Sequence, residues 1–181
     1  MVAHDRRVRV GAIVALAVLV GFVAWLIFKG DDNNKANGPT RAPAVGASQA
    51  QLQALQGQAG HEVYWAGRKT GYTYELTQTS QGNIFVRYLP AGVEVGDPRP
   101  NFLTVGTYPR RDAYTSLKKI STKQGSVSRR LAGGGIAVYS EEGPASVYAA
   151  YPGKGFQVEV YDPSPTRARE LVLSGRVRPL P

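Results

Sequence analysis

The sequence predicts an α+β fold, a mainly antiparallel sheet with two or three short helices, preceded by one N-terminal transmembrane helix. Two observations lead to this fold class. An uncharged apolar run occupies Val10 to Phe28, and beyond residue 60 apolar and polar residues alternate with a period of two between turn residues. The chain therefore divides into a cytoplasmic tail (1–9), a transmembrane helix (10–28), a flexible linker (29–47) and an extracytoplasmic α+β domain (48–181).

The apolar run is long enough to cross a bilayer. As a helix its nineteen residues extend about 28 Å, close to the thickness of the hydrocarbon core. A cleavable signal peptide is the alternative, but its apolar core is shorter and small residues precede its cleavage site. Here bulky residues, Trp25 to Phe28, occupy that place. We expect the helix to be retained as a signal anchor.

The charges beside the run predict its orientation. Three arginines precede it within nine residues, whereas Lys29 is followed by Asp31 and Asp32. The positive-inside rule then places the N-terminus in the cytoplasm and the domain outside the cell membrane. Pairs of small residues four apart, such as Gly11 and Ala15, would allow a homodimer, although small residues are common in membrane helices and give it no specific support.

The first elements after the Gly-, Asn- and Pro-rich linker are a helix and a meander. Ser48 to Ala59 is expected to be helical, with Ser48 as N-cap. The strands Glu62 to Ala66, Tyr72 to Thr79 and Ile84 to Leu89 are expected to form an antiparallel meander with one buried face. A long loop, Pro90 to Asn101, follows.

The second half of the domain repeats this mixture. After a strand at Phe102 to Tyr108, Asp112 is expected to cap a helix whose apolar face carries Ala113, Leu117 and Ile120, with Gly125 as the stop. A last helix is expected from Pro165 to about Leu173, capped by Ser164 and closed by Gly175. The strands between the two helices are expected at Ser126 to Leu131, Ile136 to Ser140, Ala145 to Tyr151 and Phe156 to Tyr161.

Four motifs between His61 and Pro109 resemble a known group of proteins. These are HEVYWAG, GYTYELT, VRYLPAG and FLTVGTYP. They resemble uncharacterised extracytoplasmic domains of single-pass proteins of actinobacteria. The resemblance implies the same topology, an anchored domain outside the membrane, and it implies no activity.

The composition excludes several classes of chemistry. The chain has no cysteine, which excludes disulfides, thiolate catalysis, zinc-thiolate and iron-sulfur sites, and a lipidated N-terminal cysteine. It has two histidines, and His4 precedes the membrane run, so a histidine metal cluster is not expected in the domain. We therefore expect no cofactor, no metal site and no catalytic residue.

A basic segment is the sharpest candidate for a binding site. From His61 onward the chain has 16 Lys and Arg against 10 Asp and Glu, and one segment with a single acid, Asp112, accounts for the excess. Its cations can bind anionic lipid or polymer, or they can simply form the charged outer face of an amphipathic helix. They are Arg110, Arg111, Lys118, Lys119, Lys123, Arg129 and Arg130.

Other residues favour structural roles. Gly133 to Gly135 lacks the spacing of a phosphate-binding loop and indicates a hairpin turn, and Glu141 and Glu142 would point to opposite faces of a strand. His61 has no nucleophile setting around it. The ten tyrosines suit half-buried sheet positions, although they can also line a groove.

The leading hypothesis is a non-catalytic, membrane-anchored module of the cell envelope. Its partners would be the bilayer, through Val10 to Phe28, and an envelope protein or an anionic polymer or lipid. One alternative is an electrostatic binder that acts through the basic segment, and another is an enzyme with an Asp, Glu or Tyr site that the sequence does not reveal. Nucleic acid is not expected outside the cell.

Overall fold

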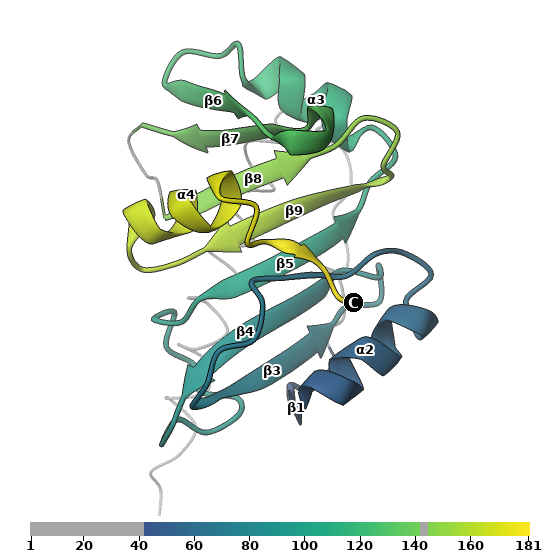
Figure 1. Cartoon of the computed structure of the whole chain (residues 1–181), viewed down its shortest axis with the longest axis vertical. Helices are drawn as coiled ribbons and strands as arrows, with labels where there is room; N and C mark the ends of the chain where they lie inside the picture. Colours follow the sequence, from purple (N-terminus) through teal and green to yellow (C-terminus); the bar gives the residue numbers. More distant parts are fainter. Residues whose placement is uncertain (1–41, 142–144) are drawn as a thin grey trace, which may run out of the picture.

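A computed structural model describes residues 42–141 and 145–181. In these residues eight strands form one antiparallel sheet in the order β1-β3-β4-β5-β9-β8-β7-β6 (Figure 1). The α+β class with a mainly antiparallel sheet is confirmed. No helix within 42–141 or 145–181 has the length and apolarity to cross a bilayer. The predicted membrane span, Val10 to Phe28, lies outside the described residues.

The first half of the domain contains one helix and five strands, and the second half contains two helices and five strands. The first-half elements are β1 (Val45–Ala47), α2 (Gln49–Gln58), β2 (Tyr64–Trp65), β3 (Tyr72–Gln78), β4 (Ile84–Pro90) and β5 (Thr104–Pro109). The second-half elements are α3 (Ala113–Ile120), β6 (Ser126–Arg130), a 3₁₀ turn (Ala132–Gly134), β7 (Ile136–Ser140), β8 (Ser146–Ala150), β9 (Phe156–Tyr161), α4 (Pro165–Leu173) and β10 (Arg178–Pro179). The sheet begins in the last three residues of the predicted linker.

The two faces of the sheet carry different helices. On one face, here called the α4 face, Leu52 of α2 and Ala168 and Val172 of α4 join the largest apolar core. Figure 1 shows α4 in front of the sheet and α2 at the lower right, near β1 and the end of β3. On the other, here called the α3 face, Ala113 and Leu117 of α3 form a second, smaller core with Val138 and Ala150. Strands of both halves contribute to the larger core, whereas β7 and β8 of the second half supply the sheet residues of the smaller one.

The predicted meander is wrong in its first strand. Only Tyr64 and Trp65 of the segment Glu62 to Ala66 are extended, and they pair with β10 in a separate two-stranded sheet rather than with β3. The Tyr64 N–H donates to Thr107 Oγ1 at 3.0 Å, which seats β2 across the α4 face. Val63, Tyr64 and Trp65 are consecutive and all buried, so this segment lacks the one-sided burial of a meander strand.

A buried ion pair on the α3 face also corrects the expectation of one buried face. Arg87 of β4 donates to Glu75 Oε1 of β3 at 2.8 Å, and both side chains are at most 10% exposed. The pair holds the loop Pro90 to Asn101 against the sheet, since the backbone N–H of Gly96 donates to Glu75 Oε2 and Arg87 also donates to the carbonyl oxygen of Arg99. Removing one partner of such a pair costs about 3–5 kcal/mol.

Side-chain capping bonds are present at two of the three predicted helix caps. Ser48 forms a capping box with Gln51, and Ser164 accepts from the N–H of Arg167 ahead of α4. Asp112 is the N-cap residue of α3, as predicted, but its side chain makes no capping bond and instead accepts from Arg110 at 2.9 Å. The carboxylate therefore joins an ion pair at the surface instead of closing the helix end.

The β5–β9 ladder contains a close approach that requires glycine. Gly106 of β5 lies opposite Glu159 of β9, and the ring of Tyr108 folds back over Gly106 so that its hydroxyl donates to the Glu159 carboxylate. A methyl carbon on residue 106 would lie 2.9 Å from Cε2 and 3.1 Å from the hydroxyl oxygen of Tyr108. The ring cannot keep both its place and its hydrogen bond if that methyl group is present.

We therefore expect Gly106→Ala to lower the free energy of unfolding by about 1–3 kcal/mol, the usual cost of overpacking a filled site. Denaturant unfolding followed by tryptophan fluorescence measures it. Gly155→Ala is the matched control, because nothing lies within 4 Å of its added methyl group. Equal stability of the two variants would contradict the steric role of Gly106.

Candidate functional site

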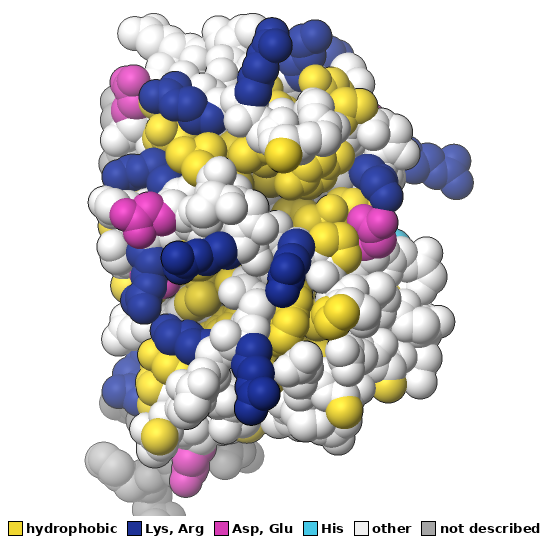
Figure 2. Space-filling model, in the orientation of Figure 1, with side chains coloured by type: hydrophobic (Ala, Val, Ile, Leu, Met, Phe, Trp, Pro, Cys, Tyr) yellow, Lys and Arg dark blue, Asp and Glu magenta, His cyan; other side chains and the backbone are white. Residues whose placement is uncertain are grey.

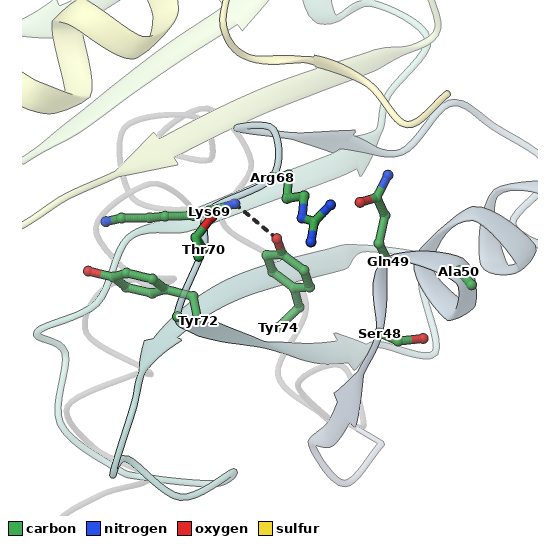
Figure 3. Close-up of a pocket in the computed structure, with 9 residues that line it drawn as sticks. Ser48, Gln49, Ala50, Arg68, Lys69, Thr70, Tyr72 and Tyr74 are labelled. Carbon is green, nitrogen blue, oxygen red and sulfur yellow. Dashed lines mark hydrogen bonds between the residues drawn. The ribbon is translucent and has the colours of Figure 1, made fainter.

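A pocket of about 430 Å³ lies between the start of α2 and the segment that enters β3 (Figure 3). Its lining combines two cations with two tyrosines and with the first residues of the helix. The lining residues are Ser48, Gln49, Ala50, Arg68, Lys69, Thr70, Gly71, Tyr72 and Tyr74.

Tyrosine hydroxyls of the sheet fix the basic wall of this pocket. The Tyr88 hydroxyl accepts from the N–H of Ala66 at 2.8 Å and donates to the carbonyl of Gly67 at 3.1 Å. The Tyr74 hydroxyl accepts from the N–H of Lys69 at 3.0 Å. Burial raises the pKa of the Tyr88 hydroxyl well above its ordinary value, so this anchor stays protonated. Two buried rings thus hold the backbone on both sides of Arg68.

The strand β1 positions the opposite wall. Ala47, the last residue of β1, pairs with the pocket-lining residue Tyr74. The chain therefore leaves the sheet beside the pocket and continues directly into α2. The capping box closes on Ser48, whose backbone N–H donates to Gln51 Oε1 at 2.8 Å. As in any helix, the first-turn N–H groups have no partner within the helix, and those of Gln49 and Ala50 belong to pocket-lining residues.

The electrostatics of the pocket favour a negative ligand. The Lys69 ammonium lies 3.8 Å from the centre of the Tyr72 ring, and in Figure 3 the Arg68 side chain extends toward Gln49 and Tyr74. Within the described ranges neither cation forms an ion pair. Arg68 is exposed and Lys69 is half-buried. An anion that enters here meets uncompensated positive charge and an aromatic surface.

The seven predicted anion-binding residues do not converge on one point. Arg110 is neutralised by Asp112, and its hydrogen bond, with a second from Ser116, lowers the pKa of the Asp112 carboxyl to about 2. The remaining six are exposed and, in the part of the chain that the structure describes, form no ion pair. They spread along α3, the turn after it and the edge strand β6. The pocket lies at the opposite edge of the sheet, beside β1 and β3.

The other residues singled out by sequence have structural surroundings. His61 is half-buried with each ring nitrogen near a carbonyl, of Glu62 at 2.9 Å and of Gly82 at 3.0 Å. Gly133 and Gly134 lie in the turn between β6 and β7, as predicted. Glu141 is exposed, while Glu142 lies outside the described residues.

A polar cluster made of one buried carboxylate and three hydroxyl groups lies on the α3 face, beside the β8–β9 ladder. Glu159 is 7% exposed and accepts from Ser146 at 2.8 Å, from Tyr148 at 3.0 Å, and from Tyr108. Burial raises the pKa of the Glu159 carboxyl above its ordinary value of 4.5, although the three hydroxyl donors oppose the shift. Burial likewise raises the pKa of Tyr148, and the Glu159 charge adds to this shift. The cluster forms an internal polar contact of the sheet.

The raised pKa predicts how stability depends on pH. The folded protein binds a proton at Glu159 more tightly than the unfolded chain does, so this group stabilises the fold below pH 4.5 and loses that contribution as pH rises through the raised pKa. We expect the stability of Glu159→Gln relative to the native chain to increase between pH 4.5 and 7. Urea unfolding of both proteins at each pH measures it, and a pH-independent difference would contradict the assignment.

Within 42–141 and 145–181 no group of three or more His, Cys, Asp or Glu residues is placed to hold a metal ion. Comparison of the chain with protein-family models, with curated proteins and with solved structures finds no match. The pocket is therefore interpreted from its own chemistry.

Sequence reasoning missed the two cations of the pocket. Arg68 and Lys69 stand between Gly67 and Gly71, where the chain turns before β3. A basic pair between two glycines ahead of a tyrosine-rich strand was the available signal. The contribution of α2 was not visible, because β1 brings that helix to the pocket only through its pairing with β3.

Proposed function

We propose that the chain is a membrane-tethered, extracytoplasmic binding module that holds a small organic anion in the pocket between α2 and β3. The observation that carries the proposal is the pair Arg68 and Lys69, which line a pocket of about 430 Å³ and form no ion pair with any carboxylate of the described residues. The ligand class is a phosphate- or carboxylate-bearing small molecule. No catalytic step is proposed.

The pocket supplies both charge and contact area. Each charge-assisted hydrogen bond contributes about 1.5–3 kcal/mol, and the arginine fork suits the two oxygens of a phosphate or carboxylate. The volume lies at the lower end of the range for small-molecule sites and exceeds the size of a bare inorganic anion. The uncharged part of the ligand would then contact the Tyr72 ring, beside the Lys69 ammonium that lies over it.

The length of the proposed tether would limit the distance between the pocket and the membrane. The proposed membrane helix ends at Phe28, and the described chain begins at Ala42. The thirteen residues between them reach about 45 Å when fully extended, so the pocket would stay near the extracytoplasmic surface of the membrane. Anionic small molecules of the envelope would therefore be encountered at this height.

Binding of glycerol 3-phosphate, with glycerol as the uncharged comparator, tests the pocket. Using the full-length chain in a non-ionic detergent, we expect Arg68→Gln and Lys69→Gln each to weaken binding of glycerol 3-phosphate at least tenfold, measured by calorimetry. The loss should shrink as salt rises, because exposed charges are screened.

Lys123→Gln is the matched control, since it removes the same charge at the opposite edge of the sheet. It should bind like the native chain. An equal loss in Lys123→Gln would indicate non-specific attraction, and absence of binding by the native chain would reject the proposed ligand class.

Topology is tested separately. A reporter that is active only outside the cytoplasm, fused to Pro181, should be active while the protein stays in the membrane fraction after an alkaline wash. An inactive reporter would place the domain in the cytoplasm, and release by the wash would show that residues 10–28 do not anchor the chain.

A further inference from the structure

The strand β6 forms one edge of the sheet, and its outer side is open to pairing. It is the last strand in the sheet order and pairs with β7 alone. The bonds from Leu131 N–H to the Gly135 carbonyl and from Glu141 N–H to the Gly125 carbonyl fix the alternation of the ladder. Because hydrogen-bonded pairs recur at every second residue of an antiparallel ladder, the backbone N–H and C=O groups of Val127 and Arg129 point toward β7.

The intervening residues point their backbone groups outward. Of these, Ser126 donates to the carbonyl of Lys123 at 3.1 Å, while the N–H groups of Ser128 and Arg130 have no partner in the described residues. An incoming extended chain would find two donors with the repeat of a regular strand, about 6.4–6.8 Å, which is twice the rise per residue.

Cations lie on this edge and in the elements that lead into it. Arg129 and Arg130 end the strand, Lys123 accepts through its carbonyl from the Ser126 N–H at the start of the strand, and Lys118 and Lys119 lie in the last turn of α3, which packs against β7 and β8. All five are exposed. Arg129 turns its guanidinium to the carbonyl of Ser128 at 2.9 Å, which places positive charge on the edge itself. No carboxylate in the described ranges pairs with any of the five.

An apolar strip accompanies the charge on the α4 face. Val127 pairs with Tyr139 of β7, and both are half-buried, with Arg169 5.5 Å above the Tyr139 ring. Figure 2 shows hydrophobic side chains bordered by Lys and Arg at this end of the sheet. A strand added to β6 would place alternate side chains beside this strip and the others beside the lysines on the α3 face.

Charge on an edge strand commonly protects a sheet from pairing with a second copy of itself. Here the protection is electrostatic alone, since β6 keeps regular pairing over five residues, with no bulge or proline. Two copies of this edge repel each other, whereas the same charges attract an acidic strand. The edge therefore discriminates between partners by charge and leaves the N–H groups of Ser128 and Arg130 available for hydrogen bonds.

We propose that β6 is a docking edge for an extended acidic segment of a partner protein, which adds to the sheet as a ninth strand. Main-chain bonds to Ser128 and Arg130 hold the segment, its acidic side chains face the lysines, and its apolar side chains cover Val127 and Tyr139. This site is independent of the pocket.

The test uses the full-length chain in a non-ionic detergent at 0.15 M salt, with a ten-residue peptide of alternating Glu and Val as probe. We expect fluorescence anisotropy to show binding, and Ser128→Pro to weaken it at least tenfold, because proline removes an outward N–H while sparing the β6–β7 ladder. Ser128→Ala, which keeps the N–H, is the matched control and should bind like the native chain.

Comparison probes separate strand addition from attraction by charge alone. Polyglutamate of the same length and vesicles of anionic lipid should bind more weakly than the alternating peptide. Equal binding of either probe, unchanged binding by Ser128→Pro, or no binding of the alternating peptide would overturn the proposal. If Ser128→Pro fails to fold, hydrogen exchange in the native chain decides: the peptide must slow exchange at the Ser128 and Arg130 amides.

Discussion

The pairing of β5 with β9 is the constraint on which the rest of the domain depends. It joins residues that are 47 to 57 positions apart in the sequence and unites two four-stranded halves in one sheet. Without this ladder the sheet would divide into two four-stranded pieces, and the larger core, to which both pieces contribute, would be split. The ladder is filled on both sides, with Val105 opposite Val160 on the α4 face and Gly106 opposite Glu159 on the α3 face. Gly106 leaves space for the Tyr108 ring, which packs over the β5–β9 ladder and donates a hydrogen bond to Glu159. A larger side chain at residue 106 would displace this ring.

The candidate pocket shows how core packing produces a binding surface in this protein. Tyr74 and Tyr88 are buried and pack edge to face, with ring centres 5.3 Å apart, as expected of aromatic residues in a sheet. Their hydroxyls need partners, and the backbone of residues 66–69 supplies them. The same bonds that satisfy the buried hydroxyls therefore hold Arg68 in place. A structural role and a binding role are consequently not alternatives for these tyrosines.

Sequence periodicity predicted the elements that bury one face over many residues or that end in recognisable caps. The helix α4, with Ser164, Pro165 and Gly175 at its ends, is an example, and the strand β7 has the predicted bounds. It failed where tertiary contacts decide: two-residue β2 pairs with the distant β10, and the buried Glu75 and Arg87 have the composition of a solvent face. Half of the candidate site was similarly hidden, because the basic residues of the pocket become significant only when β1 brings α2 beside them. Six of the seven residues in the predicted basic segment are exposed. That Arg129 and Arg130 lie on an edge strand of the sheet follows only from the strand order.

The strand order also gives the domain a length. The described chain begins beside β3, where the Ala42 N–H bonds the carbonyl of Gln78, and seven strand spacings of about 4.8 Å separate β1 from β6. The far edge thus stands about 34 Å from the side on which the chain enters. In a protein tethered as proposed, the sheet would act as a rigid spacer that keeps the cationic edge about 34 Å from the edge beside the pocket, wherever the flexible tether carries the domain. Adding or removing strands would change that reach in steps of one strand width, whereas lengthening the tether would only enlarge the volume through which the domain moves.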